Sequence, residues 1–333
     1  MNKIELKPPI IIKKLESIMK RVPKTHQKQP QITERHRRFK SGFNGEQSLK
    51  FFYRYLPKEG LSYLPGLRIM HDDYYFQMDL LIVTPHFFLI LEIKNHAGHL
   101  YFDDKIKQMI RSVNGKVEAY EDPIEQVKRQ SYHLEKIIEE YKLPAVPIER
   151  LIVISNSSTH VGFSPSYKEA FQRVIKSSQL PNKFAEYQQK YQEPLLTKKE
   201  ISKYIKQLFK LHDAYDPDVC ELFQINKSEL MKGVYCQKCD RSFIMQYIRA
   251  NWRCSNCGHT SKTTHVEALI DYALLISPTI TNQQCKDFLN LPSRSITTHL
   301  LKTLNLPYEG SRKSRSYHLL PLLKFHKENL TDA

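Results

Sequence analysis

The sequence predicts an α/β protein in which a mixed β-sheet is flanked by helices and followed by two smaller units. Three observations predict this. Strand-like segments lie between helical patterns over residues 41–215, two C-x-x-C pairs follow within residues 231–262, and residues 263–333 contain short helical patterns. The length of 333 residues also exceeds that of one ordinary domain.

Changes of composition predict where these units begin and end. The net charge is +16, and residues 1–40 supply +9 of it, from 12 lysines and arginines against three glutamates. This basic arm is predicted either to lie along phosphates as a flexible segment or to be a solvated tail with no role. The predicted segments are the arm, 1–40; the α/β domain, 41–215; a linker, 216–230; the cysteine-rich unit, 231–262; and the C-terminal unit, 263–333.

The charge and the apolar runs restrict the partners. A net charge of +16 and a pI near 9.4 favour a polyanionic partner such as nucleic acid. Residues 1–20 lack the apolar run of a secretory signal, and the longest apolar stretch, 80–93, is interrupted and too short to span a bilayer. We expect a cytoplasmic protein with no membrane partner, and the sequence leaves its oligomeric state open.

The α/β domain is assigned element by element. A helical pattern from Gly45 ends at Pro57 and Gly60, strand patterns follow, and Asn114-Gly115 marks a hairpin. Asp122-Pro123 begins a strong helix that runs to about residue 142, and an all-apolar run predicts one more buried strand. The predicted strands are 67–70, 77–84, 87–95, 99–102 and 151–154, and residues 168–212 are predicted to be helical.

Three charged residues lie inside the most apolar of these strands. Because strand side chains alternate, Glu92 and Lys94 share one face. If a turn at Pro85-His86 closes a symmetric hairpin, cross-strand partners sum to 171, and Asp79 faces Glu92. A register shift from an odd-length loop would remove this pairing.

Opposed carboxylates repel each other unless a cation lies between them. Mg²⁺, or Mn²⁺, suits two carboxylates together with water and phosphate oxygens. Lys94 would then orient or deprotonate an attacking water, or neutralise charge on the phosphate. This interpretation predicts hydrolysis of a phosphodiester. The alternative is a structural ion pair at a sheet edge.

Four segments together resemble the nuclease-related domain (NERD), a branch of the PD-(D/E)XK nuclease superfamily, over about residues 40–155. They are residues 42–46, residues 77–79, residues 92–95 with Gly98, and residues 122–126. The resemblance implies a restriction-endonuclease-like fold. It also implies a catalytic set of Glu46, Asp79, Glu92, Lys94 and Gln126, with the catalytic metal held by Asp79, Glu92 and the backbone carbonyl of Ile93. One departure is His86-Phe87, where the family usually has glycine in the turn.

The two C-x-x-C pairs predict a structural zinc site. Cys236, Cys239, Cys254 and Cys257 have a spacing close to that of four-cysteine zinc ribbons. Four thiolates occupy all four coordination positions of a tetrahedral zinc ion and leave none for water. A thioredoxin-like redox pair is the alternative, and the absence of a surrounding βαβ pattern argues against it.

Residues 263–333 predict a helix-turn-helix unit that resembles a winged helix. Helical patterns cover 266–276, 282–289 and 293–304, and a basic hairpin follows at 308–319. The same elements also suit a protein-docking module. The residues predicted to contact DNA are Arg294, Thr297, Thr298, Lys302, Arg312, Lys313 and Arg315.

Together these observations predict a metal-dependent nuclease that hydrolyses DNA and is targeted by a zinc ribbon and a winged-helix-like tail. A catalytically inactive DNA-binding regulator or scaffold that keeps the nuclease fold is the first alternative. An RNA-processing nuclease is the second, because the residues do not distinguish RNA from DNA.

Overall fold

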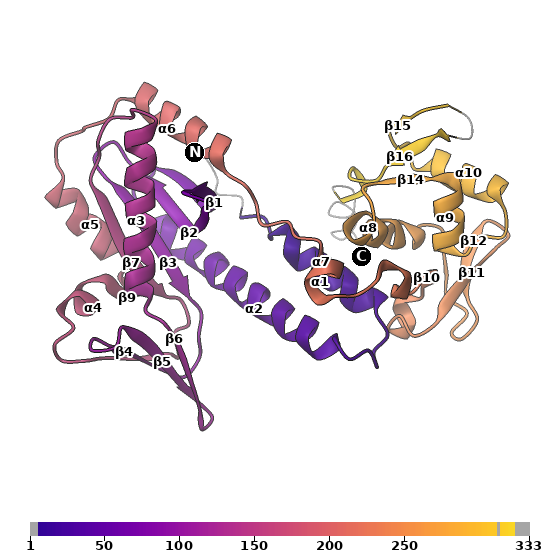
Figure 1. Ribbon diagram of the computed structural model, residues 1–333, viewed down its shortest axis with the longest axis horizontal. Helices are drawn as coiled ribbons and strands as arrows, with labels where there is room; N and C mark the ends of the chain where they lie inside the picture. Colours follow the sequence, from indigo (N-terminus) through magenta and orange to yellow (C-terminus); the bar gives the residue numbers. More distant parts are fainter. Residues whose placement is uncertain (1–5, 312–313, 324–333) are drawn as a thin grey trace. The chain divides into compact units, whose positions relative to one another are not determined.

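The computed structural model describes residues 6–311 and 314–323 and divides into two compact units (Figure 1). The first, which we call the sheet unit, contains residues 39–215 and the segment before Pro9. The second, the cysteine unit, contains residues 9–38 and the chain from residue 216 onward.

A five-stranded mixed sheet forms the centre of the sheet unit. Its order is β1-β2-β3-β7-β9, with β1, β2 and β3 antiparallel and β3, β7 and β9 parallel. The apolar runs of the sequence predict buried strands in this region. The strands are β1 (Ser62–His71), β2 (Tyr74–Val83), β3 (Phe88–Lys94), β7 (Ile148–Ile154) and β9 (Val174–Lys176).

Helices cover both faces of this sheet, and the alternation of β3 divides the core between them. Phe88 and Ile90 pack on the face covered by α3 (Pro123–Glu140) and α6 (Lys198–Leu211). Leu89 and Leu91 belong to the opposite core, with side chains from the 3₁₀ helix η1 and from α5. These two elements are η1 (Leu49–Tyr55) and α5 (Leu180–Lys190).

A second sheet of four strands, in the order β6-β5-β4-β8, completes the sheet unit. Asn114 and Gly115 connect two of its strands with φ angles of 50° and 75°, which is the left-handed turn that the Asn-Gly pair predicts. The elements are β4 (His99–Asp103), β5 (Gln108–Val113), β6 (Lys116–Glu121) and β8 (His160–Phe163), followed by α4 (Lys168–Arg173) and η2 (Ser177–Gln179).

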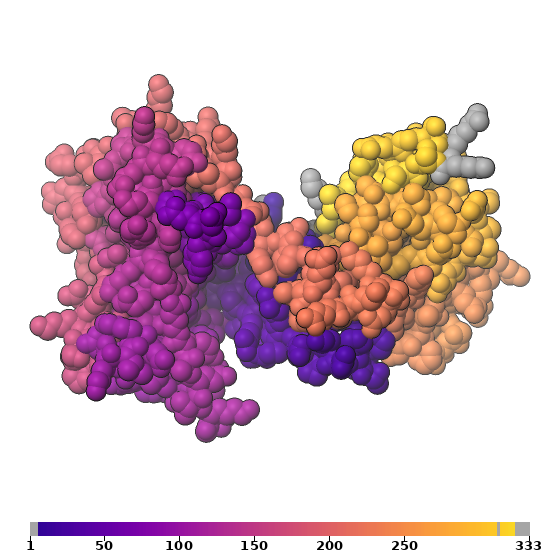
Figure 2. All heavy atoms as spheres, in the orientation of Figure 1, coloured from indigo at the N-terminus to yellow at the C-terminus, as the bar shows by residue number. Residues whose placement is uncertain are grey.

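The basic N-terminal segment is helical, so the prediction of a flexible arm over residues 1–40 is wrong for its described part. It forms α1 (Ile10–Arg21) and the first part of α2 (Gln29–Ser48). Ile11, Leu15 and Ile18 recur at helical spacing and are fully buried in α1. In Figure 2 the indigo N-terminal segment lies against the orange segment that follows residue 216, and α1 contacts both α7 and α8.

The rest of the cysteine unit begins with α7 (Val219–Phe223), inside the predicted linker. Val219, Cys220 and Phe223 are buried there, so this segment is packed. A four-stranded sheet carries the cysteines. Its elements are β10 (Val234–Tyr235), β11 (Ile244–Ile248), β12 (Asn251–Cys254) and β13 (Thr260–Ser261), with the 3₁₀ helices η3 (Lys227–Glu229) and η4 (Gln237–Cys239).

Three helices and a three-stranded sheet, β14-β16-β15, end the described chain. Thr281 and Ser293 cap the second and third helices, as predicted. No helix of the described chain is long and apolar enough to cross a membrane. The elements are α8 (His265–Leu275), β14 (Thr279–Thr281), α9 (Asn282–Leu289), α10 (Arg294–Thr303), β15 (Tyr308–Glu309) and β16 (Ser316–His318).

Candidate active site and cysteine centre

The hairpin of β2 and β3 has the predicted register, since its pairs run from Val83↔Phe88 to Leu80↔Leu91. The ladder stops there, one pair before Asp79 and Glu92. Asp79 Oδ2 instead accepts a hydrogen bond of 2.8 Å from the backbone N–H of Ile93. In a continued ladder that N–H would point to the carbonyl of Met78. The Asp79 carboxylate therefore lies where regular pairing of the two strands ends.

Strands β1 and β2 are irregular at the position where this pairing ends. Met78 and Leu81 of β2 contribute to the same core although they are three positions apart, so the alternation shifts between them. The same shift occurs in β1, where Gly66 has a φ of 60°. Backbone irregularity at Gly66 and Asp79 thus places a charged side chain within an apolar strand.

Glu92 and Lys94 share the face of β3 that lies under α3. Lys94 Nζ donates to Glu92 Oε1 at 2.7 Å and to Gln126 Oε1 at 3.1 Å. Glu92 is only 3% exposed, whereas Lys94 is half-buried. Asp122 fixes the start of α3 by accepting the N–H of Ile124 at 2.9 Å. The structure therefore brings Glu92, Lys94 and Gln126 together.

Gln130 is a member of this cluster that the sequence analysis missed. Its Nε2 donates to Glu92 Oε2 at 2.9 Å and to the carbonyl of Gln77 at 2.7 Å. It therefore joins the buried carboxylate to the backbone of β2 beside Asp79. The signal available in the sequence was the i, i+4 spacing of Gln126 and Gln130 on a helix whose other buried residues, apart from Ser131, are apolar.

Glu46 reaches the site from the end of α2, where a glycine permits close packing. A Cβ on Gly45 would lie 2.8 Å from Asn95 Cβ and 3.0 Å from Ser155 Oγ. Asn95 Nδ2 also donates to the carbonyl of Ser41 at 2.9 Å. Helix α2 is thus held against the ends of β3 and β7, and this contact positions Glu46.

The electrostatics of the site show a surplus of negative charge. Burial, followed by the charge of Glu92, raises the pKa of Glu46 to about 7. Burial, Glu92 and Glu46 raise the pKa of Asp79, whereas Lys94 and the Ile93 N–H oppose this change. Burial alone would lower the pKa of Lys94, but the carboxylates of Glu92 and Asp79 raise it. Lys94 therefore stays charged near neutral pH.

The three carboxylates suit a cation with an open coordination shell. Among the described residues, the oxygens of Glu46, Asp79 and Glu92 do not all lie within 4.8 Å of one another, unlike the four cysteine sulfurs. A site with two carboxylates and several waters matches Mg²⁺ better than a closed protein cage would. The position of the Ile93 carbonyl as a ligand stays a prediction.

The four cysteines converge as predicted. All are free thiols whose sulfurs lie within 4.8 Å of one another, with 3.7 Å between Cys236 and Cys257 and 3.8 Å between Cys239 and Cys254. Tetrahedral zinc with Zn–S bonds of about 2.3 Å requires sulfurs about 3.8 Å apart. Asn256 Nδ2 also donates to Cys239 Sγ at 3.4 Å. These side chains therefore fit a structural metal such as zinc.

The predicted DNA-contact residues divide into three groups. Arg294 and Lys302 are exposed on α10, and Thr298 is half-buried and accepts a hydrogen bond from Asn282. Thr297 is fully buried and donates to the carbonyl of Ser293, so its prediction as a contact residue is wrong. Its helical spacing to Leu300 and Leu301 places it on the inward face.

The predicted basic hairpin is described only in part. Arg315 is half-buried, and its guanidinium lies 4.1 Å from the centre of the Tyr308 ring. This contact gives Arg315 a packing role in the hairpin. Arg312 and Lys313 lie outside the described residues.

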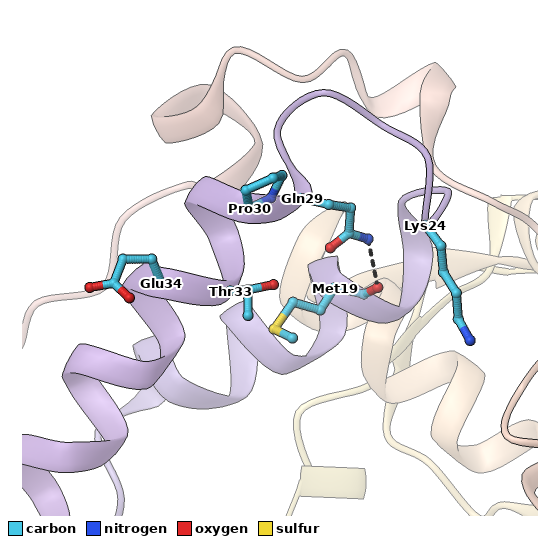
Figure 3. Close-up of a pocket in the computed structure, with 6 residues that line it drawn as sticks. All are labelled: Met19, Lys24, Gln29, Pro30, Thr33 and Glu34. Carbon is cyan, nitrogen blue, oxygen red and sulfur yellow. Dashed lines mark hydrogen bonds between the residues drawn. The ribbon is translucent and has the colours of Figure 1, made fainter. Parts of the chain in front are cut away.

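A surface hollow of about 510 Å³ lies where α1 turns into α2 (Figure 3). Gln29 Nε2 holds this turn by donating to the carbonyls of Met19 and Val22, at 3.2 and 3.0 Å. Lys24 and Glu34 are its charged lining residues. The lining contains none of the predicted site residues.

Comparison with known proteins identifies one domain. The family model of the nuclease-related domain (NERD) matches residues 41–155, about a third of the chain. The matched segment contains Glu46, Asp79, Glu92, Lys94 and Gln126. Searches of curated proteins and of solved structures gave no match.

Proposed function

We propose that the sheet unit is a metal-dependent nuclease of the PD-(D/E)XK type that hydrolyses phosphodiester bonds in DNA. The observation that carries this proposal is the surplus of carboxylates around Lys94, within a segment that matches the nuclease-related domain. Buried like charges raise the free energy of the folded chain unless a bound ligand of opposite charge compensates them. A divalent cation is the ligand that this charge favours.

Each residue of the cluster has a distinct role in the proposal. Asp79, Glu92 and the carbonyl of Ile93 would hold Mg²⁺ or Mn²⁺, which supplies Lewis-acid activation of a phosphate and a bound water. Lys94, kept charged by its carboxylate neighbours, orients the attacking water and neutralises charge on the phosphate. Gln126 positions Lys94, and Gln130 positions Glu92. Glu46 borders the site as a group that exchanges protons near neutral pH.

The ion pair itself supports a second candidate, an inactive DNA-binding scaffold that keeps the nuclease fold. Lys94 and Glu92 contact each other at 2.7 Å, and their side chains are 19% and 4% exposed. Such a pair also occurs as a purely structural feature. The two functions differ in whether the variants below lose hydrolysis or only stability.

The test is a hydrolysis assay on plasmid, linear and single-stranded DNA, and on RNA of matched sequence, with Mg²⁺ or Mn²⁺. Glu92→Gln and Lys94→Met should each reduce hydrolysis at least 100-fold while the protein stays folded. Glu139→Gln is the matched control. It removes an exposed carboxylate of α3 that pairs with Lys136, and it should be fully active. Equal activity of the wild type and the three variants would reject the nuclease proposal. Preferential cleavage of RNA would show that RNA, and not DNA, is the substrate.

The cysteine unit supplies binding in this proposal. Cys236, Cys239, Cys254 and Cys257 hold structural zinc, and α9 and α10 with the β14-β16-β15 sheet act as a winged helix that contacts DNA. The order helix, strand, two helices, two strands supports this assignment, and so do the exposed Arg294 and Lys302. Free thiols at metal-binding spacing also support a reducing compartment such as the cytoplasm.

A further inference from the structure

The short helix η1 exposes aromatic rings directly after the segment that carries Glu46. Phe51 is 51% exposed and Tyr55 is 63% exposed. The Phe51 ring lies 5.7 Å from the Tyr55 ring and 5.2 Å from the Phe52 ring, both in edge-to-face geometry. Exposed aromatic clusters of this kind mark interaction sites in soluble proteins.

The surroundings of these rings are basic, which indicates the chemistry of the partner. The Arg54 guanidinium lies 5.6 Å from the centre of the Phe51 ring. Arg54 itself is exposed and Lys50 is half-buried, while beyond the end of η1 the exposed Lys58 is followed by the exposed Glu59. Aromatic faces with neighbouring cations fit nucleobases and the phosphates that join them. A purely apolar protein partner would not use these charges.

The opposite side of the same segment packs on the face of the sheet that lies away from α3. Leu49 is fully buried in the core beneath the sheet, and the Tyr53 ring lies 5.4 Å from the Tyr63 ring. Burial, followed by the charges of Glu46, Tyr63 and Asp79, raises the pKa of Tyr53. Tyr53 is thus a residue of η1 that is within electrostatic range of Glu46 and Asp79.

Distance along the helix also fits a bound strand. Phe51 is five positions after Glu46, and a rise of 1.5–2.0 Å per residue makes this about 8–10 Å along the helix axis. Bases in one strand of B-DNA are about 3.4 Å apart, so the interval corresponds to roughly three base spacings. A strand with one phosphate at the acidic site would reach these rings with a nearby base.

We propose that Phe51 and Tyr55, together with Arg54, form a stacking platform for unpaired bases of a single-stranded nucleic acid whose backbone enters the acidic site. This rests on the proposed function, because it takes nucleic acid as the substrate. Bases within a duplex stack on each other and present no free face. The platform therefore selects single strands, frayed ends or flaps over continuous duplex.

The experiment measures binding separately from hydrolysis. A fluorescent oligothymidine and a blunt hairpin duplex with the same number of nucleotides are titrated with the full chain, without added divalent metal. The Phe51→Ala/Tyr55→Ala variant should bind the single strand about tenfold or more weakly, since each stacked ring contributes about 1–3 kcal/mol. Duplex affinity should change less than twofold.

Two further variants keep the result interpretable. Phe51→Trp/Tyr55→Trp retains ring faces and should restore single-strand affinity. Tyr132→Ala is the control on α3 of the same unit and should leave affinity unchanged. The ring that it removes is 53% exposed, and Lys136 Nζ lies 5.9 Å from the ring centre. If the double alanine variant unfolds, Tyr55→Leu keeps apolar bulk without a ring and replaces it.

Three results would overturn the platform. The first is unchanged single-strand affinity in the folded alanine variant, and the second is equal loss for single strand and duplex. The third is loss of self-association on size-exclusion chromatography without any change in oligonucleotide binding, which would assign the rings to a protein contact. Single-strand binding that depends on the rings, in a chain without hydrolysis, supports the platform and rejects only the nuclease proposal.

Discussion

Asp79 Oδ2 accepts the backbone N–H of Ile93 at 2.8 Å, in the place where a carbonyl of β2 would continue the ladder. One carboxylate oxygen therefore supports the sheet, and the proposed metal would bind through the other. This division separates the structural effect of the residue from its chemical effect.

Asp79→Asn should preserve the support and remove the negative charge. The amide oxygen still accepts the Ile93 N–H, so we expect a free energy of unfolding within about 1 kcal/mol of the wild type. Hydrolysis should fall at least 100-fold because the metal loses a ligand. Asp79→Ala should lose hydrolysis and also about 1–3 kcal/mol, measured by urea denaturation. Wild-type activity of the asparagine variant would contradict the metal site.

Gln130→Met should destabilise the protein by about 1–3 kcal/mol, because Glu92 Oε2 and the Gln77 carbonyl would lose their donor in a buried position. Gln126→Met is the matched control one helical turn away. Its amide contacts only the half-buried Lys94 in the described cluster, so we expect a smaller change in Tm with a loss of kcat. The same Tm for the two variants would show that Gln130 does not support Glu92.

Gly45→Ala should move the end of α2 away from the sheet. The new Cβ would lie 2.8 Å from Asn95 Cβ, which is not a flexible side-chain end. We expect a loss of about 1–3 kcal/mol and reduced hydrolysis through displacement of Glu46. Gly42→Ala on the same helix is the control, because nothing lies within 4 Å of its added Cβ. It should be neutral or stabilising by up to about 1 kcal/mol, and equal destabilisation by both variants would reject the close contact.

Glu46 should make stability depend on pH in the metal-free protein. Its folded pKa is about 7, whereas the unfolded value is near 4.3. Between these values the folded chain holds the proton more tightly, so unfolding releases it and stability falls as the pH rises through this window. Glu46→Gln does not titrate. It should match the wild type at pH 4 and be more stable by about 1 kcal/mol at pH 8, after allowance for solvent screening. Urea denaturation at both pH values checks this, and a constant difference would contradict the raised pKa.

The cysteine centre should contain one zinc ion per chain by elemental analysis. Cys236→Ser or Cys254→Ser should lose the zinc and lower the Tm, because metal affinity contributes directly to the folding of the small four-stranded sheet that carries the cysteines. Cys285→Ala is a buried-cysteine control outside the cluster and should retain zinc. Zinc retained after loss of Cys236, or lost with Cys285, would contradict the assignment.

The sequence predicted those parts of the fold that follow from strong periodic patterns. Strand alternation and a short turn fixed the pairing of β2 with β3, and C-x-x-C spacing identified the four sulfurs that converge. Neither pattern needs knowledge of distant contacts. The close approach at Gly45 and the hydrogen bonds of Gln130 do need it, so sequence alone could not place them.

Two predictions failed because local patterns had competing interpretations. The abundance of lysine and arginine in residues 1–40 concealed the apolar positions 11, 15 and 18, which become a buried face only against α7 and α8. Thr297 has a polar side chain but lies on the inward face of α10, where its hydroxyl is satisfied by the carbonyl of Ser293. In both cases tertiary packing determined the result.

The buried ion pair between Arg21 and Asp271, 2.8 Å apart, joins the two separate chain segments of the cysteine unit. These segments are synthesised at different times. The sheet unit is inserted between the two segments in the sequence. Helix α1 can therefore pack against α8 only after almost 180 intervening residues have been synthesised. A fragment that begins at residue 216 would lack the α1 face that packs on α8 and the Arg21 guanidinium that pairs with Asp271. Expression of the isolated C-terminal half therefore requires residues 9–38 to be supplied with it, either fused or as a separate peptide.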